Sequence, residues 1–462
     1  MSNYNLLEYL YARGVRMKIV IVGAGKVGYT LAQRLTHDGH DIIVIEKNDE
    51  RRGIIEYNLD VMTVVGNGAS PKLLSEIGIE NVEMMIAVTD SDEVNMVACV
   101  AAKQSGVPRV IARVRNPEYL EHDCQTFGRV LGIDLIINPE MVTAVEVSRI
   151  LKTPAALDVK DFTDGKVRML EVKIRINSSF IGVPIRKLQL SSNVLIAGIL
   201  RKDKMIIPQG NDMIEAHDSV FFIGDKEVIC NMENLFIEKR ARIKKVLIVG
   251  AGRIGRYLTL ILESSGYTVK VIEKDRHRCE ELAKVVDKAM IICGDGTDVE
   301  LLADEGIGDC DAVVCLTDDD KLNLLVALLA KNFGVQKTFV RVGRPEFIPL
   351  MEQVGVDVVF SPRLLTAGTI LRQVRRGDIV SVTLFEGAKA EAIELDISSG
   401  SRLNGKQLRD IKFPRPALIG TVVRKGQPFV PNGDSILSAG DQIILFTLPD
   451  YATKVLDFIE GR

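Results

Sequence analysis

Two glycine-rich segments are the part of the sequence best suited to bind a charged ligand. Gly23-Ala24-Gly25-Lys26-Val27-Gly28 recurs as Gly250-Ala251-Gly252-Arg253-Ile254-Gly255. In a loop of this kind between a strand and a helix, the first glycine allows a tight turn and the second lets the backbone approach a diphosphate. Free backbone N–H groups and the positive end of the helix then favour the anion. The motif therefore predicts a nucleotide site in each segment, and the alternative is a glycine turn that binds no ligand.

An acidic residue stands 23 positions after the first glycine of each segment, Glu46 after Gly23 and Glu273 after Gly250. A carboxylate placed at the end of the second strand of such a fold accepts the ribose hydroxyls of a nucleotide and repels a 2′-phosphate. The spacing therefore predicts NAD(H) or an adenine nucleotide such as ATP or ADP, rather than NADP.

Further polar residues follow the other predicted strands, at the sheet edge where ligands of open α/β sheets bind. Asn67 and Asp295 are candidates for an adenine or ribose contact. Thr89-Asp90 and Thr317-Asp318 can contact the ligand or cap the next helix. Arg113 and Arg341 can hold phosphate or form a salt bridge, and Lys26 and Arg253 in the glycine loops can reinforce phosphate binding.

No residue is nominated as catalytic. The sequence has no GxSxG, GxxxxGK[ST] or HExxH motif, its five histidines are scattered, and none stands at metal-ligand spacing. A dehydrogenase would need an acid or base beside the nicotinamide. An NAD-dependent oxidoreductase of unknown substrate remains the alternative to a binding protein, and no metal site is expected.

Short apolar runs alternate with helical patterns in the first part of each half. The expected strands of the first half are Lys18–Val22, Ile42–Ile45, Met62–Val65, Met85–Val88, Arg109–Arg113 and Leu135–Ile137. Continuous apolar strands separated by helices indicate a parallel sheet that is covered on both faces. The fold class is therefore α/β, with Rossmann-like domains expected at 17–139 and 244–363.

The rest of each half has a different pattern. Alternating strands with turn signals, together with a helix-like Pro184–Leu190, predict a small α+β domain at 158–239 and again at 380–462. The segments 140–157 and 364–379 are predicted to be linking helices, and the basic run Lys239–Lys245 an exposed linker.

The halves are an internal duplication. Lys18–Lys47 and Lys245–Lys274 share 14 identical residues of 30 at an offset of 227. The offset then becomes 228, where Asn95 matches Asn323, and later 223, where Pro139 matches Pro362. Repetition at a fixed spacing is the signature of duplicated structural units.

Composition narrows the class of protein. The chain has 462 residues, 47% of them hydrophobic, and a formal net charge of -3, which is typical of a globular protein of several domains and not of a nucleic-acid binder. No apolar run approaches the ~18 residues of a membrane helix. Seven cysteines without a CxxC pair are no disulfide framework. Residues 1–16 lack a signal peptide and are expected to be a short extension, so a cytoplasmic location is the default.

The order of these segments resembles the TrkA family of Trk potassium uptake systems, whose members carry two RCK-type (regulator of potassium conductance) units in tandem. The resemblance covers nearly the whole chain from Met17. The sequence features that carry it most clearly are Lys18–Gly28, Glu46, Ala87–Asp90, Asn95–Ala98 and Arg113–Arg115.

The resemblance implies a cytosolic regulatory subunit on the inner face of the cell membrane. It would bind NAD(H) and/or ATP or ADP and gate a separate pore subunit of the TrkH, TrkG or KtrB type. Family ligand contacts map to Gly23–Val27, Glu46, Thr89, Asp90 and Arg113, and through the repeat to Gly250–Ile254, Glu273, Thr317, Asp318 and Arg341. Two occupied sites per chain and a ring of four chains are expected. Asn67 opposite Asp295 suggests that the two sites differ.

Overall fold

The computed structural model describes residues 16–37, 39–119, 124–152, 156–174, 176–202, 204–236, 243–374, 379–385 and 390–460. Nearly all of the expected N-terminal extension and most of the basic linker lie outside these residues. The chain divides into two compact units, and each combines equivalent parts of both halves. One unit comprises the described parts of Arg16–Lys152 and Ala241–Val374, and the other those of Thr153–Arg240 and Arg375–Arg462.

The first unit begins with a six-stranded parallel sheet, the first lobe, with strand order β3-β2-β1-β4-β5-β6. Its strands are β1 Lys18–Val22, β2 Asp41–Glu46, β3 Met62–Val65, β4 Met84–Ala87, β5 Arg109–Arg113 and β6 Leu135–Ile137. Its helices are α2 Lys26–His37, α3 Asp49–Asn58, α4 Pro71–Glu76, α5 Asp92–Gln104 and α6 Cys124–Val130, and the linking helix α7 Pro139–Leu151 follows. The strand order reverses between β1 and β4, which is where such sheets bind ligands.

The second lobe of this unit repeats the arrangement with the order β14-β13-β12-β15-β16-β17. Its strands are β12 Lys245–Val249, β13 Thr268–Glu273, β14 Met290–Cys293, β15 Ala312–Cys315, β16 Lys337–Arg341 and β17 Val358–Phe360. Its helices are α9 Arg253–Ser264, α10 Arg276–Ala283, α11 Val299–Asp304, α12 Asp320–Asn332 and α13 Ile348–Gln353, and the linking helix α14 Pro362–Val374 follows. The structure thus confirms the predicted α/β class.

Strand β1 shows why the central strands are apolar throughout. Ile19 and Ile21 pack into one hydrophobic cluster, and Val20 and Val22 into another on the opposite face of the sheet. All four side chains are buried. Successive residues of a strand point to opposite faces, so a sheet covered by helices on both sides needs apolar residues at every position.

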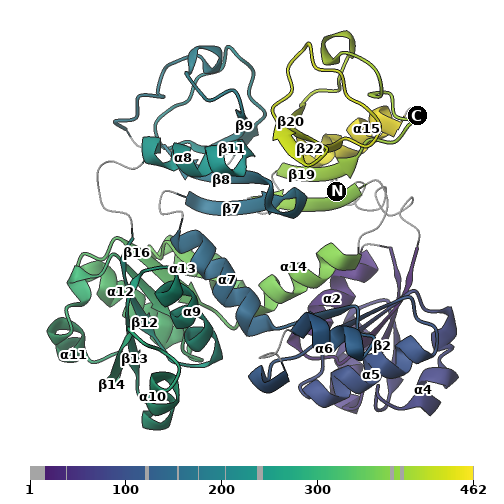
Figure 1. Ribbon diagram of the computed structural model, residues 1–462, viewed down its shortest axis with the longest axis vertical. Coiled ribbons are helices and arrows are strands. Elements are labelled where there is room, and N and C mark those ends of the chain that lie inside the picture. Colours follow the sequence, from purple (N-terminus) through teal and green to yellow (C-terminus); the bar gives the residue numbers. More distant parts are fainter. Residues whose placement is uncertain are drawn as a thin grey trace. The chain divides into compact units, whose positions relative to one another are not determined.

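Each linking helix completes the core of the opposite lobe. Ala144, Val147 and Leu151 of α7 belong to the hydrophobic cluster of the second lobe, which includes residues of β12 and α9. Ala367 and Ile370 of α14 belong to the cluster of the first lobe around β1 and α2. Figure 1 shows α7 (blue) and α14 (green) between the two lobes. The two lobes are therefore one folded body, and the core of each lobe includes a helix from the other half.

The second unit consists of two five-stranded antiparallel sheets with the orders β10-β9-β11-β8-β7 and β18-β19-β22-β20-β21. The elements of the first are β7 Ala156–Phe162, β8 Val167–Lys173, β9 Val194–Arg201, β10 Lys204–Ile206, β11 Ser219–Asp225 and α8 Lys226–Phe236. Those of the second are β18 Ile379–Phe385, β19 Ala390–Asp396, β20 Ala417–Arg424, β21 Gln427–Phe429, β22 Gln442–Thr447 and α15 Pro449–Glu460.

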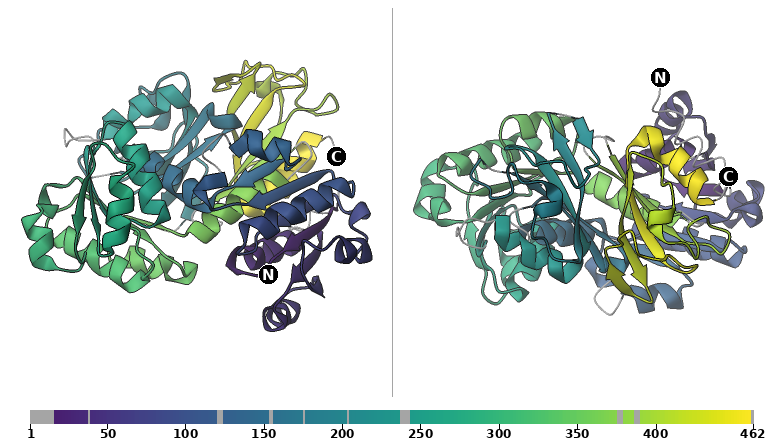
Figure 2. Two further views of the ribbon diagram at one scale, coloured as in Figure 1. Left: turned by 60° about the horizontal axis from the view of Figure 1, so that its bottom comes forward. Right: turned by 90° about the horizontal axis from the view of Figure 1, so that it is seen from above.

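The expected helix Pro184–Leu190 is wrong, because only a 3-10 turn forms there, at Ile185–Lys187. The segment instead pairs with the loop at residues 210–212, because the N–H groups of Ile185 and Arg186 donate to the carbonyls of Asp212 and Gly210. The two sheets lie side by side (Figure 2), and the rings of Phe221 and Phe446 meet with centroids 6.1 Å apart.

A bidentate ion pair recurs in the two small domains. Arg424 donates through Nε and Nη2 to the two carboxylate oxygens of Asp441, at 2.8 and 2.6 Å, and Arg201 makes the same pair with Asp218. The backbone N–H of Ser438 also donates to Asp441, at 2.8 Å. Burial by itself would raise the pKa of Asp441, but the hydrogen bonds from Arg424 and Ser438 hold it below its ordinary value.

This lowered pKa predicts acid sensitivity. A carboxyl group whose pKa is lower in the folded state contributes stability above its unfolded pKa of about 3.9, and that stability is lost as the pH falls through the folded value. We expect Asp441→Asn to cost about 1.5–3 kcal/mol at pH 7 and progressively less below about pH 4. Urea unfolding of both proteins from pH 7 to pH 2.5 measures this. A free-energy difference that stays constant with pH would contradict it.

Candidate functional site

Each glycine loop leaves a central strand and enters a helix, as its motif requires. Gly23 has a φ of +103° and Gly250 a φ of +106°, a region that other residues rarely adopt. The N–H of Gly23 donates to the carbonyl of Ile45 at 2.8 Å, and that of Gly250 to the carbonyl of Ile272 at 2.8 Å. The loops are thus attached to the neighbouring strands β2 and β13, and α2 and α9 begin at the fourth residue of each motif, Lys26 and Arg253.

The other two glycines of each loop serve different purposes. A Cβ built on Gly28 would lie 1.9 Å from the carbonyl oxygen of Gly23, and one on Gly255 would lie 2.1 Å from that of Gly250. A Cβ on Gly25 or Gly252 would meet nothing within 4 Å. Protein packing therefore explains the third glycine but not the second, and the open space beside the second fits a backbone that is kept bare for a phosphate group.

The acidic residues lie under the glycine loops. The Glu46 carboxylate is buried and accepts hydrogen bonds from the N–H groups of Ala24, at 2.6 Å, and Asn48, at 2.9 Å. Glu273 accepts in the same way from Ala251, at 2.7 Å, and Asp275, at 2.9 Å. A carboxylate has capacity for about four hydrogen bonds, so these contacts leave room for a ribose hydroxyl. The ribose contact stays a prediction, and the interaction seen here fixes the loop.

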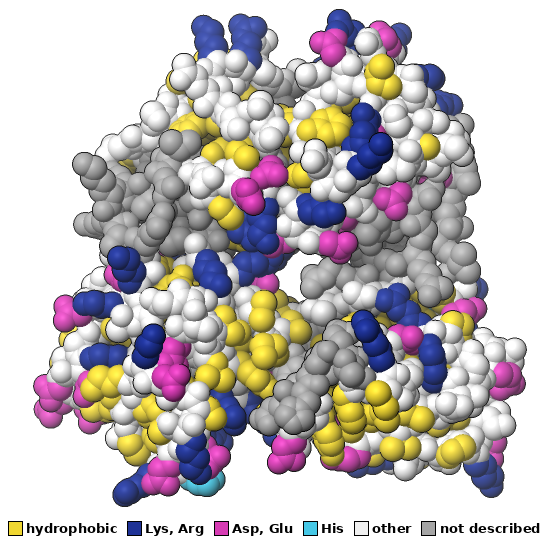
Figure 3. Space-filling model, viewed as in Figure 1, with side chains coloured by type: hydrophobic (Ala, Val, Ile, Leu, Met, Phe, Trp, Pro, Cys, Tyr) yellow, Lys and Arg dark blue, Asp and Glu magenta, His cyan; other side chains and the backbone are white. Residues whose placement is uncertain are grey.

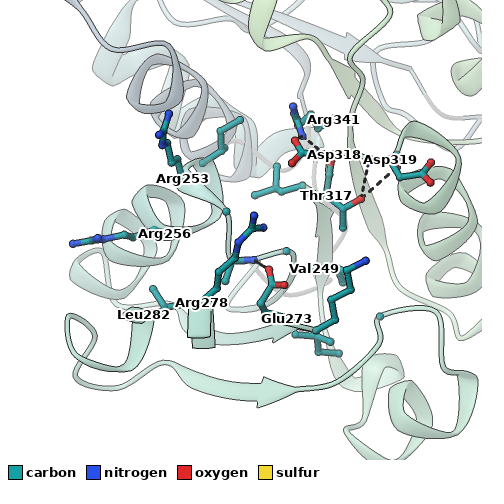
Figure 4. Close-up of a pocket in the computed structure, with 18 of the residues that line it drawn as sticks. Val249, Arg253, Arg256, Glu273, Arg278, Leu282, Thr317, Asp318, Asp319 and Arg341 are labelled. Carbon is teal, nitrogen blue, oxygen red and sulfur yellow. Dashed lines mark hydrogen bonds and ion pairs between the residues drawn. The ribbon is translucent and has the colours of Figure 1, made fainter. Parts of the chain in front are cut away.

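A cavity of about 970 Å³ opens at the glycine loop of the second lobe. Arg253 and Arg256 of α9 and Arg278 of α10 lie around it, with Glu273, Thr317 and Arg341 at the strand ends (Figure 4). All predicted residues of this site line the cavity except Gly255, namely Gly250, Ala251, Gly252, Arg253, Ile254, Glu273, Asp295, Thr317, Asp318 and Arg341. Its volume suits a nucleotide-sized ligand.

A second cavity, of about 760 Å³, opens at the glycine loop of the first lobe. The predicted residues that line it are Ala24, Gly25, Lys26, Val27, Asp90 and Arg113. The remaining predicted residues, Gly23, Gly28, Glu46, Asn67 and Thr89, do not line it. This cavity therefore covers the loop and its cationic surroundings, whereas the cavity of the second lobe also extends over the acid and Asp295.

The arginines at the ends of β5 and β16 face the cavities while making few contacts. Arg113 is 8% exposed, and its Nη2 lies 3.5 Å from Asp90, whereas Arg341 Nη1 donates to Asp318 at 2.6 Å. Among the described residues, the buried Nε atoms of Arg113 and Arg341 have no hydrogen-bond partner. Burial, and next the nearby Arg115, lower the pKa of Arg113. These arginines form the predicted salt bridges and keep donor capacity for an anion.

The threonines do not cap the next helices. Ser91 caps α5 and Asp319 caps α12. Thr89 instead bonds to the fully buried Asn95, whose Oδ1 accepts from the Thr89 N–H at 2.8 Å and hydroxyl at 2.7 Å. The Asn95 Nδ2 donates to the carbonyls of Thr89, at 3.1 Å, and Arg113, at 2.8 Å. Asn323 repeats these contacts with Thr317 and Arg341.

Asn95 and Asn323 therefore position the two strand ends that border each site. The sequence showed the repetition of this asparagine, but its role needed the three-dimensional contacts. We expect Asn95→Ala to cost about 2–3 kcal/mol of stability, because it leaves buried backbone groups unpaired, and to weaken nucleotide binding in the first lobe only. Denaturant unfolding together with calorimetric titration checks both effects, and Asn323→Ala is the matched variant for the second lobe. Unchanged stability would contradict the assignment.

Asn67 and Asp295 shape the turns that follow β3 and β14. Asn67 Oδ1 accepts from the N–H of Ala69 at 3.0 Å, and Asp295 Oδ1 accepts from the N–H and hydroxyl of Thr297 at 2.8 and 2.7 Å. The hydrogen bonds from Thr297 also lower the pKa of Asp295. Asp295 borders the cavity of the second lobe, so its charge is one difference between the lobes.

Several cavity residues were missed from the sequence. Arg51 and Arg278 each stand five positions after the acid, and this repetition is a signal that could have identified them. Arg115 and Glu140 line both cavities, and Arg363 of α14 lines the cavity of the first lobe. Arg363 in the first cavity and Glu140 in the second come from the linking helices of the opposite halves, so only the exchange of α7 and α14 reveals these two placements.

The described part of the chain holds neither a cluster of metal-ligating side chains nor a membrane-spanning helix. No group of three or more His, Cys, Asp or Glu side chains there is arranged to hold a metal ion. No helix within it has the length and apolar character needed to cross a membrane.

Two domain families each match both halves of the chain. The TrkA-N domain model matches residues 19–139 and 246–362, and the TrkA-C domain model matches residues 169–237 and 392–460. A Trk system potassium uptake protein TrkA homolog of Methanosarcina mazei is 39% identical over 447 residues, which cover 95% of this chain and 99% of that protein. The Trk system potassium uptake protein TrkA of Halomonas elongata is 36% identical over 440 residues, or 94% and 96% of the two chains.

A solved structure shares the fold. The GsuK channel bound to NAD aligns with a TM-score of 0.63 and 19% sequence identity, covering 97% of this chain and 80% of that chain. At this identity the likeness shows a common fold of paired lobes and small domains.

Proposed function

The chain belongs to the TrkA family of Trk system potassium uptake proteins, and on that premise we propose that it is the cytosolic, nucleotide-binding regulatory subunit of a potassium uptake system. The observation that carries the proposal is the pair of glycine-loop cavities in one folded unit. Each has a bare second glycine, a buried acid beneath the loop and an arginine whose buried Nε has no hydrogen-bond partner among the described residues. These features suit the phosphates and ribose of NAD(H), ATP or ADP.

The site residues of this proposal are those predicted from the sequence, with Arg51, Arg278, Arg115, Glu140 and Arg363 added. The loop amides and the lysine or arginine within each loop would hold phosphate groups. The arginines that end β5 and β16 would neutralise further charge.

Self-association is supported by apolar side chains on the surfaces of the lobes. Val97 on α5 is 52% exposed, and its repeat equivalent Leu325 on α12 is 49% exposed, with Leu328 beside it at 37%. Figure 3 shows hydrophobic side chains gathered over the part of the first lobe that carries α5. Exposed apolar patches commonly mark protein interfaces. A homotetramer would place eight lobes in a ring beneath a pore subunit of the TrkH, TrkG or KtrB type, at the inner face of the membrane.

The regulatory mechanism follows from the architecture. A nucleotide that binds one arrangement of the lobes more tightly shifts the population toward that arrangement. Because α7 and α14 belong to the cores of the opposite lobes, a change in how the lobes meet would move both sites and the ring they form.

Potassium flux through a reconstituted pore subunit tests the proposal. We expect flux to depend on this protein and to change on addition of ATP, ADP or NADH. A Glu46→Ala, Glu273→Ala double variant should lose the nucleotide response. Flux that is indifferent to the protein would refute the regulatory role.

The oxidoreductase alternative has its own test. The purified protein would have to convert NADH to NAD with an added substrate of carbonyl or quinone type. Tight nucleotide binding without any turnover across such a panel would remove the enzyme class.

A further inference from the structure

The first turns of the two linking helices carry opposite charges at matching positions. Pro139-Glu140 begins α7 and Pro362-Arg363 begins α14, at the repeat offset of 223. Arg363 lines the cavity of the first lobe, and Glu140 lines the cavity of the second lobe and borders that of the first. Arg363 in the first cavity and Glu140 in the second therefore each come from a helix of the opposite half, although Glu140 also borders the first cavity.

Arg363 sits at an electrostatically unfavourable place. The N-terminus of a helix carries partial positive charge, so an acid in the first turn is stabilising and a cation is not. The Nε of Arg363 donates to the Thr30 hydroxyl at 2.6 Å, and this hydrogen bond holds the Arg363 side chain against α2. Lys26, Arg113 and Arg115 line the same cavity. Such a concentration of positive charge is relieved when a polyanion binds.

The two cavities differ in how far acidic side chains offset the positive charge of the basic ones. The lining of the first has five Lys or Arg side chains and three acids, Asp90, Glu140 and Glu346. The lining of the second has six of each kind. Glu140 Oε1 there lies 3.9 Å from Arg253 Nη1, the cation of the glycine loop, and Glu140 Oε2 is buried without a partner among the described residues. Glu140 thus offsets the charge that would face a phosphate.

We propose that Arg363 and Glu140 set the charge preference of the two nucleotide sites, so that the first lobe favours the triphosphate ATP and the second favours nucleotides of lower charge, NAD(H) or ADP. This inference rests on the proposed nucleotide-binding function of the same sites. It assigns to each half a ligand class that the glycine motifs, being identical in type, do not distinguish.

The test uses the full chain with one site disabled. In a Gly252→Asp background, in which only the first lobe binds, ATP and NADH are titrated by calorimetry at fixed ionic strength. Arg363→Glu is expected to weaken ATP binding at least tenfold and NADH binding less than threefold. Arg363→Gln should also weaken ATP binding more than NADH binding, with a smaller loss for each. Arg34→Glu, on an exposed position of α2, is the control and should change the ratio of ATP affinity to NADH affinity less than twofold.

The reciprocal test uses a Gly25→Asp background, in which only the second lobe binds. Glu140→Gln is expected to raise the affinity for ATP at least fivefold and to keep the affinity for NADH within twofold of that of the parent protein. Equal changes in affinity for both nucleotides, or no change, would overturn the inference but leave the proposed nucleotide-binding function intact. If the wild-type protein bound neither nucleotide, the proposed function would fail as well.

Discussion

Gly25→Asp is expected to abolish nucleotide binding in the first lobe, with affinity falling at least about a hundredfold, equivalent to about 2.8 kcal/mol. The variant places a carboxylate where the loop is kept open for phosphate, so like charges repel at close range. Because a Cβ at this position meets nothing within 4 Å, the folded state should accommodate the side chain. The midpoint of thermal unfolding without nucleotide should therefore stay within about 2 °C of wild type.

Calorimetric titration with ATP and NADH measures the effect. Gly252→Asp is the matched change in the second lobe, where Gly252 has an extended backbone and equally open space. Gly53→Asp, an open position on α3 of the first lobe, controls for adding a charge to that lobe. The site assignment fails if Gly25→Asp retains two sites of wild-type affinity.

Gly28→Ala is expected to destabilise the unit of paired lobes by about 3 kcal/mol or more, at the upper end of the cost of overpacking. Its Cβ would lie 1.9 Å from the carbonyl oxygen of Gly23, and that oxygen belongs to backbone rather than to a movable side chain. Either α2 moves away from the sheet or the turn at Gly23 opens. Denaturant unfolding followed by far-ultraviolet circular dichroism measures the loss.

Gly25→Ala, three residues earlier in the same loop, is the control and should unfold as wild type does. Gly255→Ala should repeat the effect of Gly28→Ala, because its Cβ meets Gly250 in the same way. Equal stability of Gly25→Ala and Gly28→Ala would show that the third glycine is not required for packing.

The strands could be predicted closely because their signals are local. The expected strand Met62–Val65 has the bounds of β3, and the expected Met85–Val88 differs from β4 by one residue at each end. An uninterrupted apolar run between two helical patterns has few alternatives to a buried parallel strand. The segment Pro184–Leu190 failed for the opposite reason, because Ile185 and Arg186 donate to the carbonyls of a loop distant in the sequence, and only a single 3-10 turn forms within the segment.

The candidate site was predictable only where its residues belong to the loop or end a strand. The glycine motif names the backbone that approaches a ligand, and the acid after the second strand follows at a spacing set by one helix and one strand. The roles of Asn95 and Arg115 depend on how neighbouring strands and loops come together. No periodicity within the sequence encodes those contacts.

The sequence by itself determined two duplicated halves, a parallel sheet in each and a glycine loop opening its first helix, because hydrophobic periodicity and turn chemistry act over a few residues. Tertiary structure alone decided that α7 and α14 exchange lobes, and so brought Arg363 to the first cavity and Glu140, which also borders the first, to the second. An apolar helix face shows that it must be buried but not against which partner, since burial is non-directional. That choice made two nearly identical motifs into two different sites.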